Sequence, residues 1–376
     1  MNKFLNQCKG LLNSKIIPRI VVIGNESCDL DSAVCSISLA FHLSKCPSFV
    51  ETVTDWERIV PVLNLTRAEL PLKTEVIYYL QAQQIDLDSL ICKDEANFAD
   101  AAWEHTKFVL VDHHMSPHQA NVVGVVDHRP VDPHSNLTDK VFQYIEPVGS
   151  CATLVAKLID QSNMFAKHQE EYMLLFKLLY GAIILDTVNF SEQANKAREL
   201  DHYMAQLIEQ KLGISEPVSN HRKTLFETLV DKRRDVGSLD SLQILSKDLK
   251  IIARNGRTVA IPGFPILVQS YVQKPNAESN LLTFAQQTRS DVVVLMGMHV
   301  TTGSDQVRRD LGVVNIGDAV LWEKIITALV SSTLPNLSLK RRSGDEFLGG
   351  QFFDQGNIAA SRKQILPIIS NVLDKL

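Results

Sequence analysis

Apolar, β-branched runs recur through the first half of the chain, and each is followed by a helical or loop stretch. The runs lie at residues 19–24, 59–63, 76–80, 90–92, 108–111 and 122–126. After the first run, Val34, Ile37, Ala40 and Phe41 recur at the spacing of a helix that packs one face onto a sheet. Alternating strand and helix signals of this kind predict an α/β fold with a parallel sheet.

The second half of the chain has its own set of predicted elements. Before it, residues 170–185 are almost continuously apolar and predict a buried helix that ends at Asp186. Further strands are predicted at 250–253, 258–261, 266–268 and 292–296, and a closing helix at 362–375. The second half therefore also predicts an α/β arrangement.

A polar, charge-rich stretch at 191–234 lies between the two sets of elements. At 376 residues the chain is too long for one ordinary hydrophobic core. We therefore predict two domains, at residues 1–212 and 223–376, joined by a linker at 213–222.

Composition narrows the class of protein. Hydrophobic residues make up 45% and charged residues 22% of the chain, and no apolar run is long enough to span a bilayer. A net charge of -5 with a pI near 6.1 argues against stable binding of nucleic acid. We expect an intracellular protein with reduced thiols, because the six cysteines lack CxxC spacing.

The first 25 residues contain lysines and one arginine but no acidic residue. This segment resembles a weak mitochondrial presequence, but an ordinary surface helix explains it as well. The expected location is the cytoplasm, with the mitochondrial matrix as the alternative.

Polar residues of the kinds that bind metals follow the apolar runs of the first half. They are Asn25, Asp29 and Asp31 after the first run, Asp94 after another, Asp112, His113 and His114 after a third, and Asp127, His128 and Arg129 after a fourth. The carboxyl ends of parallel strands face one crevice, where ligands bind. These side chains are therefore expected to converge, together with Asp186.

Converging carboxylates repel one another unless cations compensate them. Several carboxylates with one imidazole suit Mn²⁺ or Mg²⁺ better than Zn²⁺. Two ions about 3.5–4 Å apart would generate a hydroxide nucleophile that attacks phosphorus. Any single aspartate after a strand is more often a helix N-cap or a turn former, so the prediction depends on the number of aspartates.

Four motifs carry a resemblance to a known family. They are Gly-Asn-Glu-Ser-Cys-Asp-Leu-Asp-Ser at 24–32, Val-Asp-His-His at 111–114, Val-Gly-Ser-Cys-Ala-Thr at 148–153 and Leu-Asp-Thr-Val-Asn at 185–189. Together they resemble the DHH phosphoesterases, most closely the prune proteins. The segment 356–367 resembles the C-terminal signature of family II pyrophosphatases and exopolyphosphatases. The resemblance implies a parallel-sheet DHH domain, a smaller α/β domain with a mixed sheet, and an active site in the cleft between them.

Residue by residue, the resemblance implies two metal sites. One is formed by Asn25, Asp29 and Asp94, and the other by Asp31, Asp94, His113 and Asp186, with Asp94 as the bridge. His114 would contact the phosphate or the leaving group as a general acid, and Asp112 would orient the histidine pair. Pyrophosphatases of this superfamily have histidine in place of Asn25, so efficient pyrophosphate hydrolysis is doubtful and the first metal site should be looser.

The resemblance also implies phosphate-binding residues. Arg129 would bind a phosphate oxygen or tie down the metal carboxylates. The Gly149-Ser150 pair would offer backbone N–H groups to an anion, although a closely packed helix start explains it nearly as well. In the second domain the expected phosphate clamp is Arg362 and Lys363, with Lys250 as a further candidate.

The expected function is a metal-dependent phosphohydrolase acting on short-chain polyphosphates, on cyclic nucleotides, or on both. Two alternatives stay open: a cyclic AMP phosphodiesterase, and a low-turnover regulatory partner of nucleoside diphosphate kinase, as prune proteins are thought to be. A nuclease is disfavoured by the acidic charge and by the pyrophosphatase type of the second domain.

Overall fold

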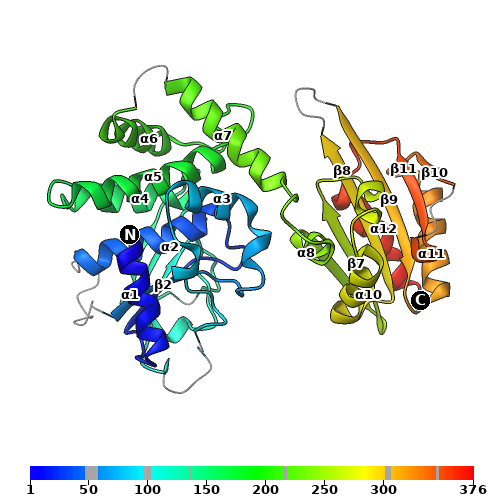
Figure 1. Cartoon of the computed structure of the whole chain (residues 1–376), viewed down its shortest axis with the longest axis horizontal. Helices are drawn as coiled ribbons and strands as arrows, with labels where there is room; N and C mark the ends of the chain where they lie inside the picture. Colours follow the sequence, from blue (N-terminus) through cyan, green and yellow to red (C-terminus); the bar gives the residue numbers. More distant parts are fainter. Residues whose placement is uncertain are drawn as a thin grey trace. The chain divides into compact units, whose positions relative to one another are not determined.

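The computed structural model describes residues 1–46, 58–96, 98, 103–135, 137–214, 218–300, 306–343 and 347–376. The chain forms two compact units, Met1–Arg233 and Arg234–Leu376, which are considered separately (Figure 1). Of the predicted linker, residues 215–217 lie outside the described residues, and 218–222 form the first turns of helix α7 (Val218–Arg234).

The first unit is built on a five-stranded parallel sheet with the order β2-β1-β3-β4-β5. The strands are β1 (Ile20–Ile23), β2 (Ile59–Val62), β3 (Lys107–Val111), β4 (Val122–Asp127) and β5 (Phe142–Ile145). All four residues of β1 and of β2 are buried, as expected for a parallel sheet covered on both faces. The predicted class of the N-terminal domain is confirmed.

The helices of the first unit pack on this sheet or on one another. They are α1 (Asn2–Asn13), α2 (Leu30–Lys45), α3 (Thr74–Ala82), α4 (Cys151–Gln161), α5 (Gln169–Asp186), α6 (Glu199–Leu212) and α7, with short 3₁₀ turns at Leu70–Leu72, Leu87–Ser89 and Gln119–Asn121. Helix α2 packs against α4, α5 and the sheet. Helix α5 is buried almost all around from Tyr172 to Leu185, which explains its continuously apolar sequence.

The second unit contains a six-stranded mixed sheet with the order β10-β11-β9-β8-β7-β6, in which only β7 and β8 pair in parallel. The strands are β6 (Leu249–Arg254), β7 (Arg257–Phe264), β8 (Val292–Val300), β9 (Val307–Asn315), β10 (Leu339–Arg341) and β11 (Gln351–Gln355). The expected mixed sheet of the C-terminal domain is confirmed.

Helices lie on both faces of this second sheet (Figure 1). They are α8 (Ser241–Lys247), α9 (Val268–Val272), α10 (Ala277–Thr288), α11 (Ala319–Ser331) and α12 (Arg362–Asp374), with a short turn at Phe347–Gly349. One core contains Leu281 and Phe284 of α10, and the other contains Ile325 of α11 and Ile365 of α12. The second unit therefore has three layers.

Three predicted strands are wrong. Residues 76–80 belong to helix α3, and Cys92 of the run 90–92 forms only an isolated bridge with Leu63. Residues 266–268 lead into the short helix α9. Strands β5, β9, β10 and β11 were not predicted. No helix in the described part of the chain is both long and apolar enough to cross a membrane.

Helix α5 crosses α3 at Gly181, where a Cβ atom would lie 2.3 Å from Cζ of Tyr79. Because the Tyr79 ring is buried and cannot retreat, Gly181→Ala is expected to lower the free energy of unfolding by about 1–3 kcal/mol. Urea denaturation measures this. In the matched control, Gly10→Ala, a Cβ on helix α1 meets no atom within 4 Å, and stability should rise by roughly 0.5–1 kcal/mol. Equal stabilities of the two variants would contradict this packing.

His42 of α2 is a buried core histidine whose Nδ1 lies 2.9 Å from the Tyr172 hydroxyl. Burial lowers its pKa from 6.5 to about 4. Between these two pH values the His42 side chain binds a proton in the unfolded chain but not in the folded chain. The free energy of unfolding therefore falls as the pH drops from about 6.5 to about 4, by about 3 kcal/mol in all. His42→Gln should flatten this part of the stability profile, measured by urea denaturation between pH 7.5 and pH 4.5. An unchanged slope would refute the assignment.

Candidate metal centre and active site

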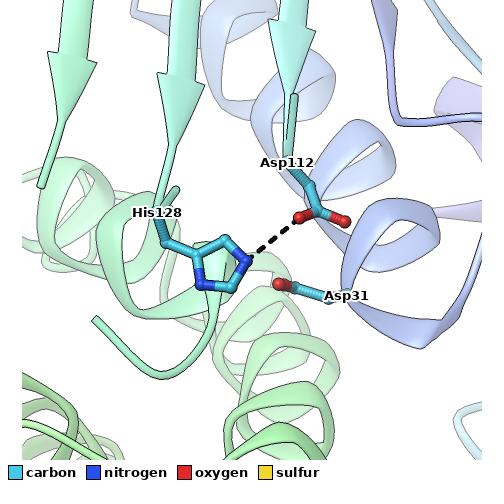
Figure 2. A group of neighbouring side chains, drawn as sticks. All are labelled: Asp31, Asp112 and His128. Atoms are coloured by element: carbon cyan, nitrogen blue, oxygen red, sulfur yellow. Dashed lines mark ion pairs between the residues drawn. The ribbon is translucent and has the colours of Figure 1, made fainter. Parts of the chain in front are cut away.

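The loops that follow β1, β3 and β4 bring three ionisable side chains together at the carboxyl ends of the parallel strands. Asp31 lies in the first turn of α2, Asp112 directly follows β3, and His128 directly follows β4. One ligand atom from each lies within 4.8 Å of the other two (Figure 2). The predicted convergence of strand ends is therefore present in the first unit.

Asp31 is held by the first turn of α4. It is 2% exposed, and its two carboxylate oxygens accept the backbone N–H groups of Cys151 and Ala152 at 2.7 and 2.8 Å. The N-terminus of a helix carries partial positive charge and therefore favours a carboxylate at this place. Burial still raises the pKa of Asp31, and the charge of His128 opposes that rise.

Asp112 interacts with four side chains. Its backbone has φ of 60°, a left-handed conformation that aspartate tolerates better than most residues. Its Oδ2 accepts hydrogen bonds from Asn25 Nδ2 at 2.7 Å and Ser32 Oγ at 2.6 Å. Its Oδ1 lies 3.2 Å from His128 Nε2 and 3.0 Å from Arg129 Nη2. Burial, followed by the charge of Asp31, nevertheless raises its pKa to about 7.

His128 provides positive charge beside these carboxylates. Its Nδ1 lies 3.0 Å from the Val148 carbonyl oxygen, and its Nε2 faces Asp112 (Figure 2). Burial lowers its pKa, but the hydrogen bond to Asp112 and the charge of Asp31 outweigh this and raise it to about 9. The sequence placed His128 among the converging residues but assigned it no role. The structure makes it an imidazolium partner of Asp112.

Asp127 organises the chain after β4. It is fully buried, and its Oδ1 accepts the backbone N–H groups of His128 at 2.8 Å and Arg129 at 3.2 Å. Its Oδ2 lies 2.5 Å from Nδ1 of His114, whose Nε2 accepts the N–H group of Asp132 at 2.9 Å. Both ring nitrogens of His114 are thus occupied, so contact with a phosphate would require the Asp132 amide to move away.

His113 has the geometry of a metal ligand. Its Nδ1 lies 2.9 Å from the Val111 carbonyl oxygen, which fixes the ring and leaves Nε2 as the atom that can bind a metal. Burial lowers the pKa of His113, and this favours the neutral imidazole that binds metals.

A cavity of about 460 Å³ in the first unit contains most of the expected carboxylates. Its lining consists of Asp29, Asp31, Asp112, His128, Arg129, Pro130, Val148, Gly149, Asp186, Asn195, Lys196 and Arg198. Asp29 is the N-cap of α2, and Asp186 is the last residue of α5. Burial and then the charge of Asp31 raise the pKa of Asp186 well above its usual value. Such crowded carboxylates fit a divalent cation site.

Three predicted ligands, Asn25, Asp94 and His113, are not part of this lining. Asn25 Oδ1 accepts the N–H groups of Ser27 at 2.9 Å and Cys28 at 3.2 Å, which closes the turn before α2. Asp94 is exposed, and its Oδ1 accepts the N–H group of Arg67 at 2.9 Å. The cavity lining in the described part of the chain does not include Asp94, so its predicted bridging role has no support from this geometry.

Arg129 contacts the acidic cluster. Besides its ion pair with the Asp112 carboxylate, its guanidinium donates to the Asp112 carbonyl oxygen. Of the two roles that the sequence left open, this contact corresponds to tying down a carboxylate, although 47% of the side chain is exposed.

The N–H group of Gly149 donates to Asp201 at 2.7 Å, and a Cβ on Gly149 would lie 2.7 Å from Thr187 Cγ2, which fits the close-packing alternative. Ser150 is the buried N-cap of α4.

The predicted phosphate clamp lies in the second unit. Arg362 donates to the Asp248 carbonyl oxygen at 2.6 Å and lies 2.5 Å from its carboxylate. Lys363 and Lys250 are exposed. Their role in substrate binding stays a prediction.

Asp201, a fully buried carboxylate in α6, was not among the predicted site residues. It accepts the N–H groups of Gly149 and Arg198, each at 2.7 Å, and the Thr153 hydroxyl at 2.5 Å. Asp201 therefore connects Gly149 and Arg198, which line the cavity, to Thr153 of α4. Its position as the third residue of a helix, where a carboxylate commonly caps the turn, was the only available signal.

Comparison with known proteins identifies the family of this chain. The model of the DHH family N-terminal domain matches residues 19–183, and that of the DHHA2 domain matches residues 227–372. Exopolyphosphatase PRUNE1 of Rattus norvegicus is 34% identical over 99% of this chain and 79% of its own length. The chain belongs to the DHH family of phosphoesterases and, within it, to the prune subfamily. It is therefore a hydrolase, as predicted.

More distant relatives have related names. A putative exopolyphosphatase of Schizosaccharomyces pombe is 25% identical over 93% of this chain and 89% of its own length. A manganese-dependent inorganic pyrophosphatase of Methanocaldococcus jannaschii is 27% identical over 67% of this chain and 73% of its own length.

Asp201→Asn replaces one acceptor oxygen by an N–H₂ group that faces a donor. We expect the free energy of unfolding to fall by about 2–3 kcal/mol, because hydrogen bonds to a buried charge are lost. Asp240→Asn is the control, because this exposed N-cap of α8 accepts the N–H group of Gln243 at 2.8 Å and should cost about 1 kcal/mol or less. Urea denaturation compares the two variants, and equal losses would remove Asp201 from its organising role.

Proposed function

We propose that this chain is a divalent-metal-dependent phosphohydrolase that acts on short-chain polyphosphates. The observation that carries the proposal is the cavity in which Asp29, Asp31, Asp112 and Asp186 meet, where burial raises the pKa of the last three carboxyl groups. The name exopolyphosphatase, carried by relatives that match nearly the whole chain, supports the same substrate class.

The residues suited to hold Mn²⁺ or Mg²⁺ are the four cavity aspartates. The family resemblance adds His113, whose Nδ1 lies against the Val111 carbonyl oxygen and leaves Nε2 for a metal. Asn25 and Asp94 remain ligands proposed from the family resemblance. Bound divalent ions supply the charge that activates water and neutralises phosphoryl oxygens. We propose two ions, the number that the family resemblance implies. The name of the pyrophosphatase relative favours manganese.

The remaining residues would prepare this site. Arg129 and His128 hold Asp112 in one orientation through contacts with the same oxygen. The first turn of α4 does the same for Asp31. Fixed carboxylates reduce the reorganisation that accompanies charge development at the reacting phosphorus.

The cavity lining bears on the choice between polyphosphate and cyclic nucleotide. A nucleotide base needs an apolar or aromatic surface, and the lining in the described part of the chain offers Pro130 and Val148 but no Phe, Tyr or Trp. It offers Arg129, Lys196 and Arg198 as cations. These residues favour a phosphoanhydride over a cyclic nucleotide and give no particular support to a low-turnover partner of nucleoside diphosphate kinase.

The test offers tripolyphosphate, pyrophosphate and cyclic AMP in parallel to purified protein with Mn²⁺ or Mg²⁺. We expect phosphate release from tripolyphosphate, and Asp186→Asn should reduce it by roughly 100-fold or more, because a direct ligand matters at least as much as the outer partners of a metal site. Asp139→Asn, at an exposed aspartate in a turn, is the matched control and should retain full activity.

Thermal unfolding separates loss of metal binding from loss of fold. The pKa of Asp186 is raised by burial and by neighbouring carboxylates, so the metal-free Asp186→Asn protein should unfold at the same or a higher temperature than wild type. Mn²⁺ should raise the Tm of wild type but much less that of the variant. Full activity in the variant would exclude the proposed metal site, whereas AMP release from cyclic AMP alone would replace the proposed substrate.

A further inference from the structure

The loop between α5 and α6 contributes cations to the cavity that the family motifs do not include. Asn195, Lys196 and Arg198 belong to the same lining as Asp186, the residue from which this loop starts. Its basic side chains therefore lie beside the carboxylates of the candidate metal centre, within the first unit alone.

The start of this loop has an unusual backbone. Val188, Asn189 and Phe190 are consecutive non-glycine residues with positive φ, at 53°, 51° and 58°. The N–H group of Asn189 donates to the Ile184 carbonyl oxygen at 2.8 Å, which ends α5 and turns the chain sharply. Each left-handed non-glycine residue costs on the order of 1 kcal/mol, so the surrounding structure must determine this path strongly.

The far end of the loop is anchored equally firmly. Asn195 has φ of 48°, and its N–H group donates to the carbonyl oxygens of Ser191 and Glu192. The N–H group of Arg198 donates to buried Asp201 at 2.7 Å. Lys196 and Arg198 thus project from a segment whose two ends are fixed to the walls of the cavity.

Lys196 and Arg198 differ from Arg129 in that Arg129 already forms an ion pair with a carboxylate. Arg129 is engaged by the carboxylate and the carbonyl group of Asp112. Within the described ranges, Arg198 donates through Nη1 to the carbonyl oxygens of Asn195 and Ala197, at 3.1 and 3.0 Å, which orients the guanidinium without neutralising it. Lys196 is exposed and has no acidic partner among the residues that the structure describes. Both charges are therefore available to an anion.

We propose that Lys196 and Arg198 form an anion subsite on the first unit that binds the phosphoryl groups adjacent to the reacting one. This inference rests on the proposed function and extends it, because it assigns selectivity for linked phosphates to residues outside the metal centre. A cyclic nucleotide has one negative charge at its phosphate, whereas tripolyphosphate has several along a chain. Two cations beside the metal centre therefore favour tripolyphosphate.

Equilibrium binding tests the subsite without relying on turnover. The probes are imidodiphosphate, which has two linked phosphoryl groups, and inorganic phosphate, each titrated calorimetrically into the full chain with Mg²⁺. Lys196→Ala/Arg198→Ala should weaken imidodiphosphate binding by about tenfold, since two partly exposed charge contacts are lost. Inorganic phosphate binding should change by less than about twofold, because a single phosphoryl group does not reach the subsite.

Matched variants control for fold and for general charge. Lys140→Ala/Lys223→Ala removes two positive charges at exposed positions outside the cavity lining and should leave both affinities unchanged. The single variant Lys196→Arg keeps the positive charge and should retain most of the wild-type affinity for imidodiphosphate. All variants should share the Tm of wild type, because neither side chain is buried.

Steady-state kinetics of the double variant provides a second, independent test of the subsite. The double variant should raise KM for tripolyphosphate by about tenfold with kcat within about twofold, and should leave KM for cyclic AMP unaltered. If wild type binds imidodiphosphate through these residues but releases no phosphate, the subsite stands and the proposed function fails. If wild type hydrolyses tripolyphosphate and the double variant matches it in KM and affinity, the subsite is refuted and the proposed function stands.

Discussion

The first unit depends on burying Asp31 and Asp112 next to each other in a place with little solvent. Two adjacent carboxylates are unstable there unless fixed positive groups face them. The protein supplies the N–H groups of α4 to Asp31, and the imidazolium of His128 and the guanidinium of Arg129 to Asp112. The loops after β1, β3 and β4 and the start of α4 must therefore meet at one point, as a topology of parallel strands allows.

A second layer of buried carboxylates makes that meeting point rigid. Asp127 binds the two N–H groups that follow it and the ring of His114, so the path of the chain after β4 is fixed. Asp201 binds the N–H groups of Gly149 and Arg198 and so joins α6 to the cavity wall. Both carboxylates are fully buried with their partners in place. Their role is to position the residues that line the cavity.

Sequence pattern identified the architecture where the hydrophobic period was unambiguous. The runs that became β1, β2, β3 and β4 are β-branched and bounded by polar residues, and each is a buried strand. The run 76–80 was mistaken for a strand because it is short and apolar, although Val76, Tyr79 and Leu80 also have the spacing of one helix face, and these three are buried in α3. Strand β9 was not predicted because the charged residues Arg308, Arg309 and Asp310 interrupt its apolar residues.

The site was predictable in outline for a physical reason. Residues after parallel strands share one edge of the sheet, so counting polar residues at strand ends found Asp31, Asp112 and His128 as neighbours. Which atoms face one another was not predictable. The left-handed turn at Asp112 determines that its carboxylate meets His128, and the partners of His114 come from residues 13 and 18 positions further along the chain. Asp201 was missed because two of its partners, the Gly149 N–H group and the Thr153 hydroxyl, lie 52 and 48 residues away along the chain.

Asn25 should change the balance between the two metal sites that we propose. Its Nδ2 donates to Asp112, and its Oδ1 accepts the N–H groups of Ser27 and Cys28. A metal at this oxygen would have to share it with two backbone donors, and an amide oxygen is a weaker ligand than the imidazole expected in pyrophosphatases. Asp186, in contrast, lines the cavity beside other carboxylates and gains most from a cation. Affinity should therefore be higher at the site that includes Asp31 and Asp186, and the site beside Asn25 should fill at higher metal concentration.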